Sequence, residues 1–212
     1  MSRSGVLEEI GLRHGTDKST IYHDYLPFYE ARLQHLRQER FVLVEVGVFH
    51  GASLRTWGEY FPHATVVGID VLEGCRCHEA GNRHVRIGDA SQTEVAQAVV
   101  AEFGRPLVVI DDGSHLWNQQ IAALQHFWPQ VLPGGVFIME DVHTSFPDHQ
   151  DAYHGGSAVN AYDYIQGLNA WVVGHDYMGE RTPPDDFVKA CWPEVWSIEW
   201  YRHTCLINKR AA

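Results

Sequence analysis

Residues 41–53, FVLVEVGVFHGAS, constrain the fold of this chain more than any other stretch. The run at 41–46 is apolar and β-branched, and because only Glu45 interrupts it, it predicts a buried central strand. Gly47 and Gly51 then bend the chain, and residues 53–60 have the pattern of a helix. A strand that passes through a glycine turn into a helix is typical of the nucleotide-type sites of α/β proteins.

Strands and helices alternate along the following part of the chain. Further strands are predicted at 65–69, 85–87, 107–110 and 136–139, with helices at 93–103, 117–132 and 161–173. This alternation predicts a mostly parallel sheet with helices on both faces. Two final strands, at 195–201 and 204–208, are joined so tightly that they can only form an antiparallel hairpin. We therefore expect an α/β, Rossmann-like fold whose mostly parallel, seven-stranded sheet ends in an antiparallel C-terminal hairpin.

Length and composition indicate one domain. The chain has 212 residues, of which 45% are hydrophobic, enough for a substantial core. We expect residues 1–212 to form a single domain, with 1–40 as an N-terminal helical lid or cap and 41–212 as the core. Within the lid, helices are predicted at 4–13, capped by Ser4, and at 24–37. Two polar stretches, about 144–160 and 176–186, are expected to be loops over the site.

Charge and hydropathy argue against several classes of partner. The net charge of -11 disfavours nucleic acid and anionic membranes, and no apolar run approaches the length that spans a bilayer. The N-terminal residues lack the apolar centre of a signal peptide because Glu8 and Glu9 interrupt it. We therefore expect a cytoplasmic protein with neither nucleic acid nor a membrane as its partner.

An acidic side chain lies at or near the end of each of the five strands predicted to be parallel. The carboxyl ends of parallel strands share one rim of the sheet, and ligands bind beyond that rim, so these acids should gather at one place. They are Glu45, Asp70, Asp89, Asp111, Asp112, Glu140 and Asp141. Any one of them could be a helix cap or a solvated turn residue, but an acid at every strand end indicates an acidic functional site.

The acids favour a cationic ligand with a ribose over a dinucleotide. The dinucleotide pattern G-x-G-x-x-G needs a second glycine where this chain has Phe49, which hinders close approach of a pyrophosphate. Asp70, at the end of its strand, is placed to accept hydrogen bonds from both ribose hydroxyls, and Asp89 is placed to meet the adenine side. Glu45 and Asp111 can hold a cationic amino-acid group, directly or through water.

Four short motifs carry a resemblance to a known family. They are Gly15-Thr16-Asp17-Lys18, Glu45-Val46-Gly47 with Gly51-Ala52-Ser53-Leu54, Ile110-Asp111-Asp112-Gly113-Ser114-His115, and Glu140-Asp141 followed by His143-Thr144-Ser145. With these motifs the chain resembles the class I methyltransferases that use S-adenosylmethionine. Within that class it is similar to the sugar O-methyltransferases of antibiotic biosynthesis, the branch of the mycinamicin and macrocin enzymes.

The resemblance implies a Rossmann-like methyltransferase fold with S-adenosylmethionine and Mg²⁺ as cofactors. The cofactor-binding residues that we expect are Thr16, Lys18, Glu45, Gly47, Ser53, Asp70, Asp89 and Asp111. Lys18 has two interpretations, since it could pair with the carboxylate of the cofactor or form a surface ion pair.

Methyl transfer to a sugar hydroxyl needs a base, a metal that acidifies the hydroxyl, or both. The resemblance makes Asp112, Glu140 and Asp141 the ligands of Mg²⁺, which prefers hard oxygen donors; their alternative role is to cap the turns that follow. It makes His115 the general base, at a helix start that disfavours the charged imidazolium; otherwise His115 is a solvent-facing histidine. His143 is the second catalytic candidate.

The expected function is therefore Mg²⁺-dependent O-methylation of a sugar hydroxyl in natural-product biosynthesis. The acceptor would be a small-molecule glycoside or a nucleotide sugar, and we expect the enzyme to self-associate, as its relatives commonly do. Three alternatives remain open at this point: an amino-sugar nitrogen or phenolic oxygen as acceptor, a non-catalytic protein that binds adenosyl ligands, and a metal hydrolase built on the same carboxylates.

Overall fold

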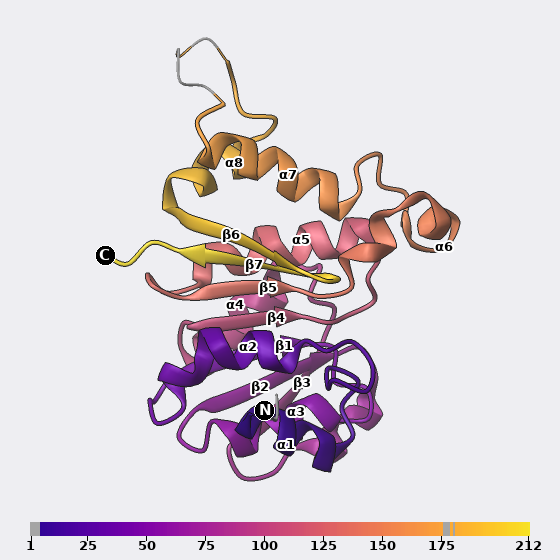
Figure 1. Ribbon diagram of the computed structural model, residues 1–212, viewed down its shortest axis with the longest axis vertical. Coiled ribbons are helices and arrows are strands. Elements are labelled where there is room, and N and C mark those ends of the chain that lie inside the picture. Colours follow the sequence, from indigo (N-terminus) through magenta and orange to yellow (C-terminus); the bar gives the residue numbers. More distant parts are fainter. Residues whose placement is uncertain (1–4, 176–178, 180) are drawn as a thin grey trace.

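The computed structural model of the protein describes residues 5–175, 179 and 181–212 (Figure 1). In this part of the chain, one seven-stranded sheet has the strand order β3-β2-β1-β4-β5-β7-β6. The strands are β1 (Val42–Val46), β2 (Thr65–Asp70), β3 (Arg83–Ile87), β4 (Val108–Asp111), β5 (Val136–Met139), β6 (Val195–Tyr201) and β7 (Thr204–Lys209). Strands β1 to β5 are parallel, and β7 is antiparallel to both β5 and β6. The predicted α/β sheet with its closing hairpin is confirmed.

Helices cover both faces of the sheet. The α-helices are α1 (Val6–His14), α2 (Leu26–Leu33), α3 (Ala52–Tyr60), α4 (Thr93–Phe103), α5 (Trp117–Phe127), α6 (Gln150–Tyr153), α7 (Ala161–Val172) and α8 (Asp186–Cys191). The 3₁₀ turns are η1 (Gln34–Leu36), η2 (Glu73–His78), η3 (Trp128–Gln130), η4 (Val142–Ser145), η5 (Pro147–His149) and η6 (Trp192–Glu194). None of the helices within the described ranges has both the length and the apolar character to cross a membrane.

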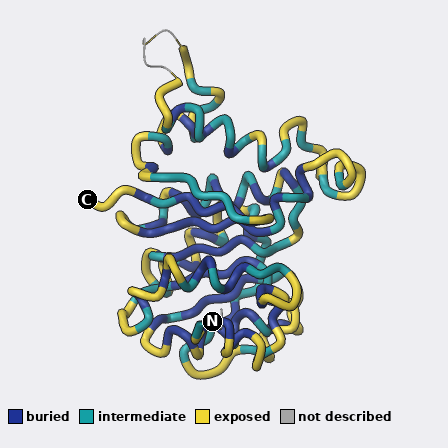
Figure 2. Tube along the Cα trace, in the orientation of Figure 1, coloured by how far each residue is buried: buried dark blue, intermediate teal, exposed yellow. Residues whose placement is uncertain are grey.

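The central strands β4 and β5 are almost entirely apolar because both of their faces are buried. In β5, Val136 and Ile138 pack into the cluster formed with α1, α2 and α3, whereas Phe137 and Met139 pack into the cluster formed with α4, α5 and α7. Successive side chains of a strand point to opposite faces, so a strand between two helical layers has no polar face. Figure 2 shows the resulting band of buried strands across the middle of the molecule.

Several boundaries differ from those predicted. The stretch 144–160, expected to be a loop, contains part of η4 together with η5 and α6, and α8 was not predicted. One-turn helices carry too few residues to show a helical period, although Pro147 at the start of η5 is a typical helix-start residue. Asp185 begins α8 by accepting a hydrogen bond from the Val188 amide at 2.7 Å.

The N-terminal helices are also shorter than predicted. Helix α1 begins at Val6 with Gly5 at its N-cap, and the expected cap, Ser4, lies outside the described residues. The helix expected at 24–37 is divided into α2 and η1, and the one expected at 117–132 into α5 and η3. Four residues of the loop expected at 176–186 also lie outside the described residues.

Candidate active site

The carboxyl ends of the parallel strands form one rim, above which lies a cavity of about 620 Å³. The register sets Val46 of β1 beside Ile69 on one side and Asp111 on the other. Of the predicted site residues, Gly47, Asp70, Asp89, Asp111, Asp112 and His115 line this cavity. The others, Thr16, Lys18, Glu45, Ser53, Glu140, Asp141 and His143, lie outside its lining.

Gly47 allows the turn after β1 to approach the turn after β4. Its φ is +90°, and a Cβ built on it would lie 2.0 Å from the backbone oxygen of Asp112. Only glycine fits both the left-handed conformation and this close contact. Phe49 also has a positive φ, of 48°, and its side chain is 70% exposed at the wall of the cavity.

Asp70 is held by the backbone of the same turn. One carboxylate oxygen accepts hydrogen bonds from the amides of Val48 at 2.9 Å and Phe49 at 3.0 Å, and the other from Leu72 at 2.9 Å. Burial raises the pKa of Asp70, but these backbone hydrogen bonds outweigh it and hold the pKa below its usual value. Asp70 therefore presents an ionised, fixed acceptor to the cavity. Asp89 lines the cavity nearby and accepts from the Ser91 amide at 2.9 Å.

Glu45 lies behind the cavity. It is fully buried, and Ser53 Oγ and Trp57 Nε1 donate hydrogen bonds to it at 2.9 and 2.8 Å. Burial raises the pKa of Glu45 to about 7. Asp111 is also buried, and burial raises its pKa to about 7, but it lines the cavity and its Oδ2 has no hydrogen-bond partner among the described residues. Asp111 thus has a carboxylate oxygen at the cavity that a ligand could hydrogen-bond.

Lys18 is buried between two predicted metal ligands. Its side chain is 1% exposed, and its ammonium group donates to Asp112 and, at 2.6 Å, to Glu140 Oε2. Burial lowers the pKa of Lys18, but Asp112 and Glu140 raise it well above its usual value, so the ammonium stays charged. The interpretation of Lys18 as a surface ion pair is therefore wrong. Glu140 has a second partner, since the Tyr29 hydroxyl donates to its Oε1 at 3.0 Å.

Asp112, His115 and Asp141 form a set that could hold a metal ion, with one ligand atom from each within 4.8 Å of the others. His115 Nε2 lies 3.5 Å from Asp141 Oδ2 and 3.9 Å from Asp112 Oδ1. The Tyr25 hydroxyl donates to Asp141 Oδ1 at 2.7 Å and so orients the carboxylate. The two hard carboxylates suit Mg²⁺, and of the predicted ligands only Glu140 lies outside this set.

Asp141 is ionised despite its partial burial. Burial raises its pKa, but His115, the Tyr25 hydroxyl, His23 and His143 together hold the pKa below its usual value. The backbone at both Asp141 and His115 is left-handed, with φ of 54° and 58°. Non-glycine residues adopt this conformation rarely, and such strain gathers at functional sites.

Histidines gather beside Asp141. The His143 ring lies 4.4 Å from that of His203 and 5.2 Å from that of His149, and its Nδ1 lies 3.9 Å from Asp141 Oδ1. Burial, more than the opposing effect of Asp141, lowers the pKa of His143, which favours the neutral imidazole. His23, His149 and His203 were not predicted as site residues. No motif marks them, because they come together only in the fold.

The fold and the rim of acids define a class I methyltransferase architecture. The structure superposes on the MycE methyltransferase of the mycinamycin biosynthetic pathway, solved in complex with Mg and SAH, with a TM-score of 0.84 at 22% sequence identity. That match covers 99% of this chain and 55% of MycE. The expected Rossmann-like methyltransferase fold is confirmed.

The sequence resembles the sugar O-methyltransferases of antibiotic pathways within this class, as predicted. It is 34% identical over 216 residues to the 8-demethyl-8-alpha-L-rhamnosyl tetracenomycin-C 2'-O-methyltransferase of Streptomyces olivaceus, covering 97% of this chain and 55% of that relative. It is 29% identical over 152 residues to the mycinamicin VI 2''-O-methyltransferase of Micromonospora griseorubida, covering 68% and 38%. The chain thus spans about half the length, or less, of these curated relatives. No protein-family model matches the chain.

Proposed function

We propose that the chain is an S-adenosylmethionine- and Mg²⁺-dependent O-methyltransferase that acts on a sugar hydroxyl of a small-molecule glycoside or nucleotide sugar. The observation that carries the proposal is one continuous rim. The cavity lined by Asp70 and Asp111 adjoins the set formed by Asp112, His115 and Asp141. The relatives support the same chemistry by their names, which describe O-methylation of a rhamnosyl tetracenomycin-C and of mycinamicin VI.

The cavity suits S-adenosylmethionine in its volume and in the acidic side chains that line it. Three amides already donate to the fixed carboxylate of Asp70, which leaves about one lone pair, on Oδ1, for a ribose hydroxyl. The apolar Leu72 and Ala90 beside it can take an adenine. The Oδ2 of Asp111, without a partner among the described residues, can accept from the amino group of the methionine part. Glu45, behind the wall, would act on the cofactor only through its negative charge.

Mg²⁺ would be held by Asp112 and Asp141, with Glu140 as the third carboxylate once it exchanges Lys18 for the ion. When bound, Mg²⁺ would lower the pKa of an acceptor hydroxyl. His115 is the base that we propose for its proton, because this half-buried imidazole lines the cavity and Asp112 and Asp141 can stabilise the imidazolium that forms. His143, on the far side of Asp141, is the second candidate.

We also propose that residues 1–212 work as one domain that self-associates in the cytoplasm. Segment 1–40 would serve as the cap, since Lys18, Tyr25 and Tyr29 from it reach the acids of the rim. All four cysteines are free thiols, which suits a reducing compartment.

Calorimetric titration with S-adenosylhomocysteine, in Mg²⁺ and again in EDTA, tests the cofactor site. We expect micromolar binding in both, about tenfold weaker in Asp70→Asn because one charged acceptor is lost. Glu73→Ala, an exposed acid just outside the cavity, is the control and should bind as the unchanged protein does. Absence of binding in both buffers would overturn the methyltransferase proposal.

Transfer of the methyl group from S-adenosylmethionine to a panel of O-glycosides, amino sugars and phenols tests the acceptor. Turnover only with the hydroxyl of a glycoside or nucleotide sugar, abolished by EDTA, is the expected result. Turnover with amines or phenols alone would overturn the acceptor class and leave the cofactor site intact.

A further inference from the structure

A second set of possible metal ligands lies on the other side of Asp141. It consists of His23, Asp141 and His203, and one ligand atom from each lies within 4.8 Å of the others. The three residues come from separate parts of the fold: the segment before α2, the start of η4, and the turn between β6 and β7. His203 is exposed and the other two are half-buried, so an ion could enter from solvent.

We propose that this set is a second cation site, selective for a borderline transition ion such as Zn²⁺ or Co²⁺. Two imidazoles and one carboxylate are the donors that such ions prefer, whereas Mg²⁺ prefers oxygen. The neighbouring set of Asp112, His115 and Asp141 has the opposite balance, two carboxylates and one imidazole. Asp141 belongs to both sets, so the two sites share a ligand and differ in hardness.

Contacts outside the three ligands already hold them together. Asp24, next to His23, forms an ion pair of 2.7 Å with Arg202, next to His203. The Val142 amide, next to Asp141, donates to the His203 carbonyl at 2.8 Å. Each ligand is thus tied to another through its immediate neighbour in the chain, and the set does not need the ion to assemble it.

Tyr25 orients two of the three ligands. Its hydroxyl donates to Asp141 Oδ1 at 2.7 Å, and its ring stacks on His23 with 5.1 Å between centroids and 21° between planes. Carboxylates and imidazoles that bind metals are commonly fixed in this way by a second layer of contacts.

His143 adds a donor at the edge of the set. Its ring lies 4.4 Å from that of His203, and its Nδ1 is buried without a hydrogen-bond partner among the described residues. A buried ring nitrogen left unpaired beside the imidazole of His203 and the carboxylate of Asp141 is better explained by a ligand than by packing.

An ion bound in this second site would weaken the binding of Mg²⁺ by the set of Asp112, His115 and Asp141. It would draw Asp141 away from Asp112 and His115, so transition ions should inhibit the reaction that Mg²⁺ supports. It would also link the segment before α2 to the β6–β7 turn across the edge of the active site, which should stabilise the folded state. The inhibition rests on the proposed function, but the binding of the ion does not.

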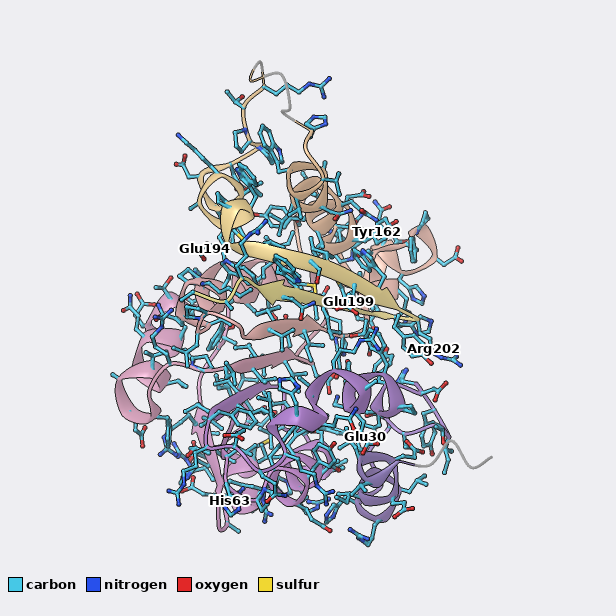
Figure 3. The ribbon with its side chains drawn as sticks, turned by 60° about the vertical axis from the view of Figure 1, so that its left-hand side comes forward. Glu30, His63, Tyr162, Glu194, Glu199 and Arg202 are labelled. Atoms are coloured by element: carbon cyan, nitrogen blue, oxygen red, sulfur yellow. The ribbon has the colours of Figure 1, made fainter. Side chains whose placement is uncertain are left out.

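Titration with CoCl₂, followed by visible absorbance and calorimetry in excess Mg²⁺, tests the site. We expect one bound Co²⁺ with d–d absorption bands, and an affinity weaker by about tenfold or more in both His203→Ala and His23→Ala, since each removes a direct ligand. The matched control is His63→Ala, another exposed histidine; Figure 3 shows His63 well away from Arg202, the neighbour of His203. The Tm should rise with Co²⁺ in the unchanged protein and in His63→Ala but not in His203→Ala.

Two outcomes would overturn the site. One is the same Co²⁺ affinity in His203→Ala, His23→Ala and the unchanged protein. The other is Co²⁺ binding that is lost only in Asp112→Asn, which would place the ion in the oxygen-rich set. A far-ultraviolet circular dichroism spectrum of His203→Ala that matches that of the unchanged protein shows that the variant is folded. Failure of the methyltransferase proposal would appear only in the titration with S-adenosylhomocysteine and would leave the Co²⁺ result unaffected.

Discussion

Glu45 is a carboxyl group in the centre of the sheet whose ionisation should weaken the fold. Burial raises its pKa to about 7 from an ordinary value of 4.5. Because the folded value is the higher one, the penalty is absent below pH 4.5, grows as the pH rises, and is complete above pH 7. A shift of this size corresponds to about 3 kcal/mol.

Glu45→Gln removes this ionisation; its amide oxygen can accept from Trp57 Nε1, and its amide nitrogen can donate to the Ser53 hydroxyl, which reverses that hydrogen bond. We expect its free energy of unfolding, relative to the unchanged protein, to increase by up to about 3 kcal/mol between pH 4.5 and 7. Urea denaturation at several pH values measures the difference. A difference that does not change with pH would show that Glu45 titrates normally in the folded protein.

At the scale of the element, the turn between β1 and α3 depends on Gly47. Gly47→Ala adds a Cβ 2.0 Å from the backbone oxygen of Asp112, so the turn has to move away from β4. We expect a loss of about 2–4 kcal/mol in unfolding free energy, from backbone strain and overpacking together, and weaker binding of S-adenosylhomocysteine.

Gly81→Ala is the matched control for this turn. Gly81 also has a positive φ, of 61°, but a Cβ on it would meet nothing within 4 Å. The Gly81→Ala variant should lose only about 1–2 kcal/mol of unfolding free energy and keep its affinity for S-adenosylhomocysteine. Equal effects of the two substitutions on stability and binding would mean that the close contact of Gly47 with the backbone of Asp112 contributes to neither.

The elements differ in how far the sequence predicts them. Strands β1 and β5 and the hairpin follow from apolar, β-branched runs, and the acids of the rim follow from their place after those runs. Helices α6 and α8 cannot be predicted in this way, because elements of four and six residues are too short to show a helical period of apolar residues.

Contacts within the site are harder to predict than its position. Lys18 meets Asp112 and Glu140, which lie 94 and 122 residues further along the chain. His203 meets His23 and Asp141 only because the hairpin turn and the segment before α2 fold against the same edge. Local pattern fixes which residues reach the rim, but the pairing across it depends on packing between distant segments.

For the molecule as a whole, Lys18 joins the N-terminal segment to the core. Lys18→Met leaves Asp112 and Glu140 without their cation in a buried place, which should cost about 3–5 kcal/mol of unfolding free energy in EDTA. Lys189→Met, an exposed lysine on α8, is the control and should stay within about 0.5 kcal/mol.

The same denaturation curves test whether residues 1–40 and the sheet unfold as one unit. We expect tryptophan fluorescence, the summed signal of seven tryptophans including Trp57 beside Tyr29 of α2, and far-ultraviolet circular dichroism to give coincident transitions in both variants. The buried contacts of Lys18, Tyr25 and Tyr29 with the rim are the physical reason, since the segment cannot detach without breaking all of them. If Lys18→Met instead separated the curves into two steps, the segment would be a lid that opens on its own, held shut in the unchanged protein by one lysine.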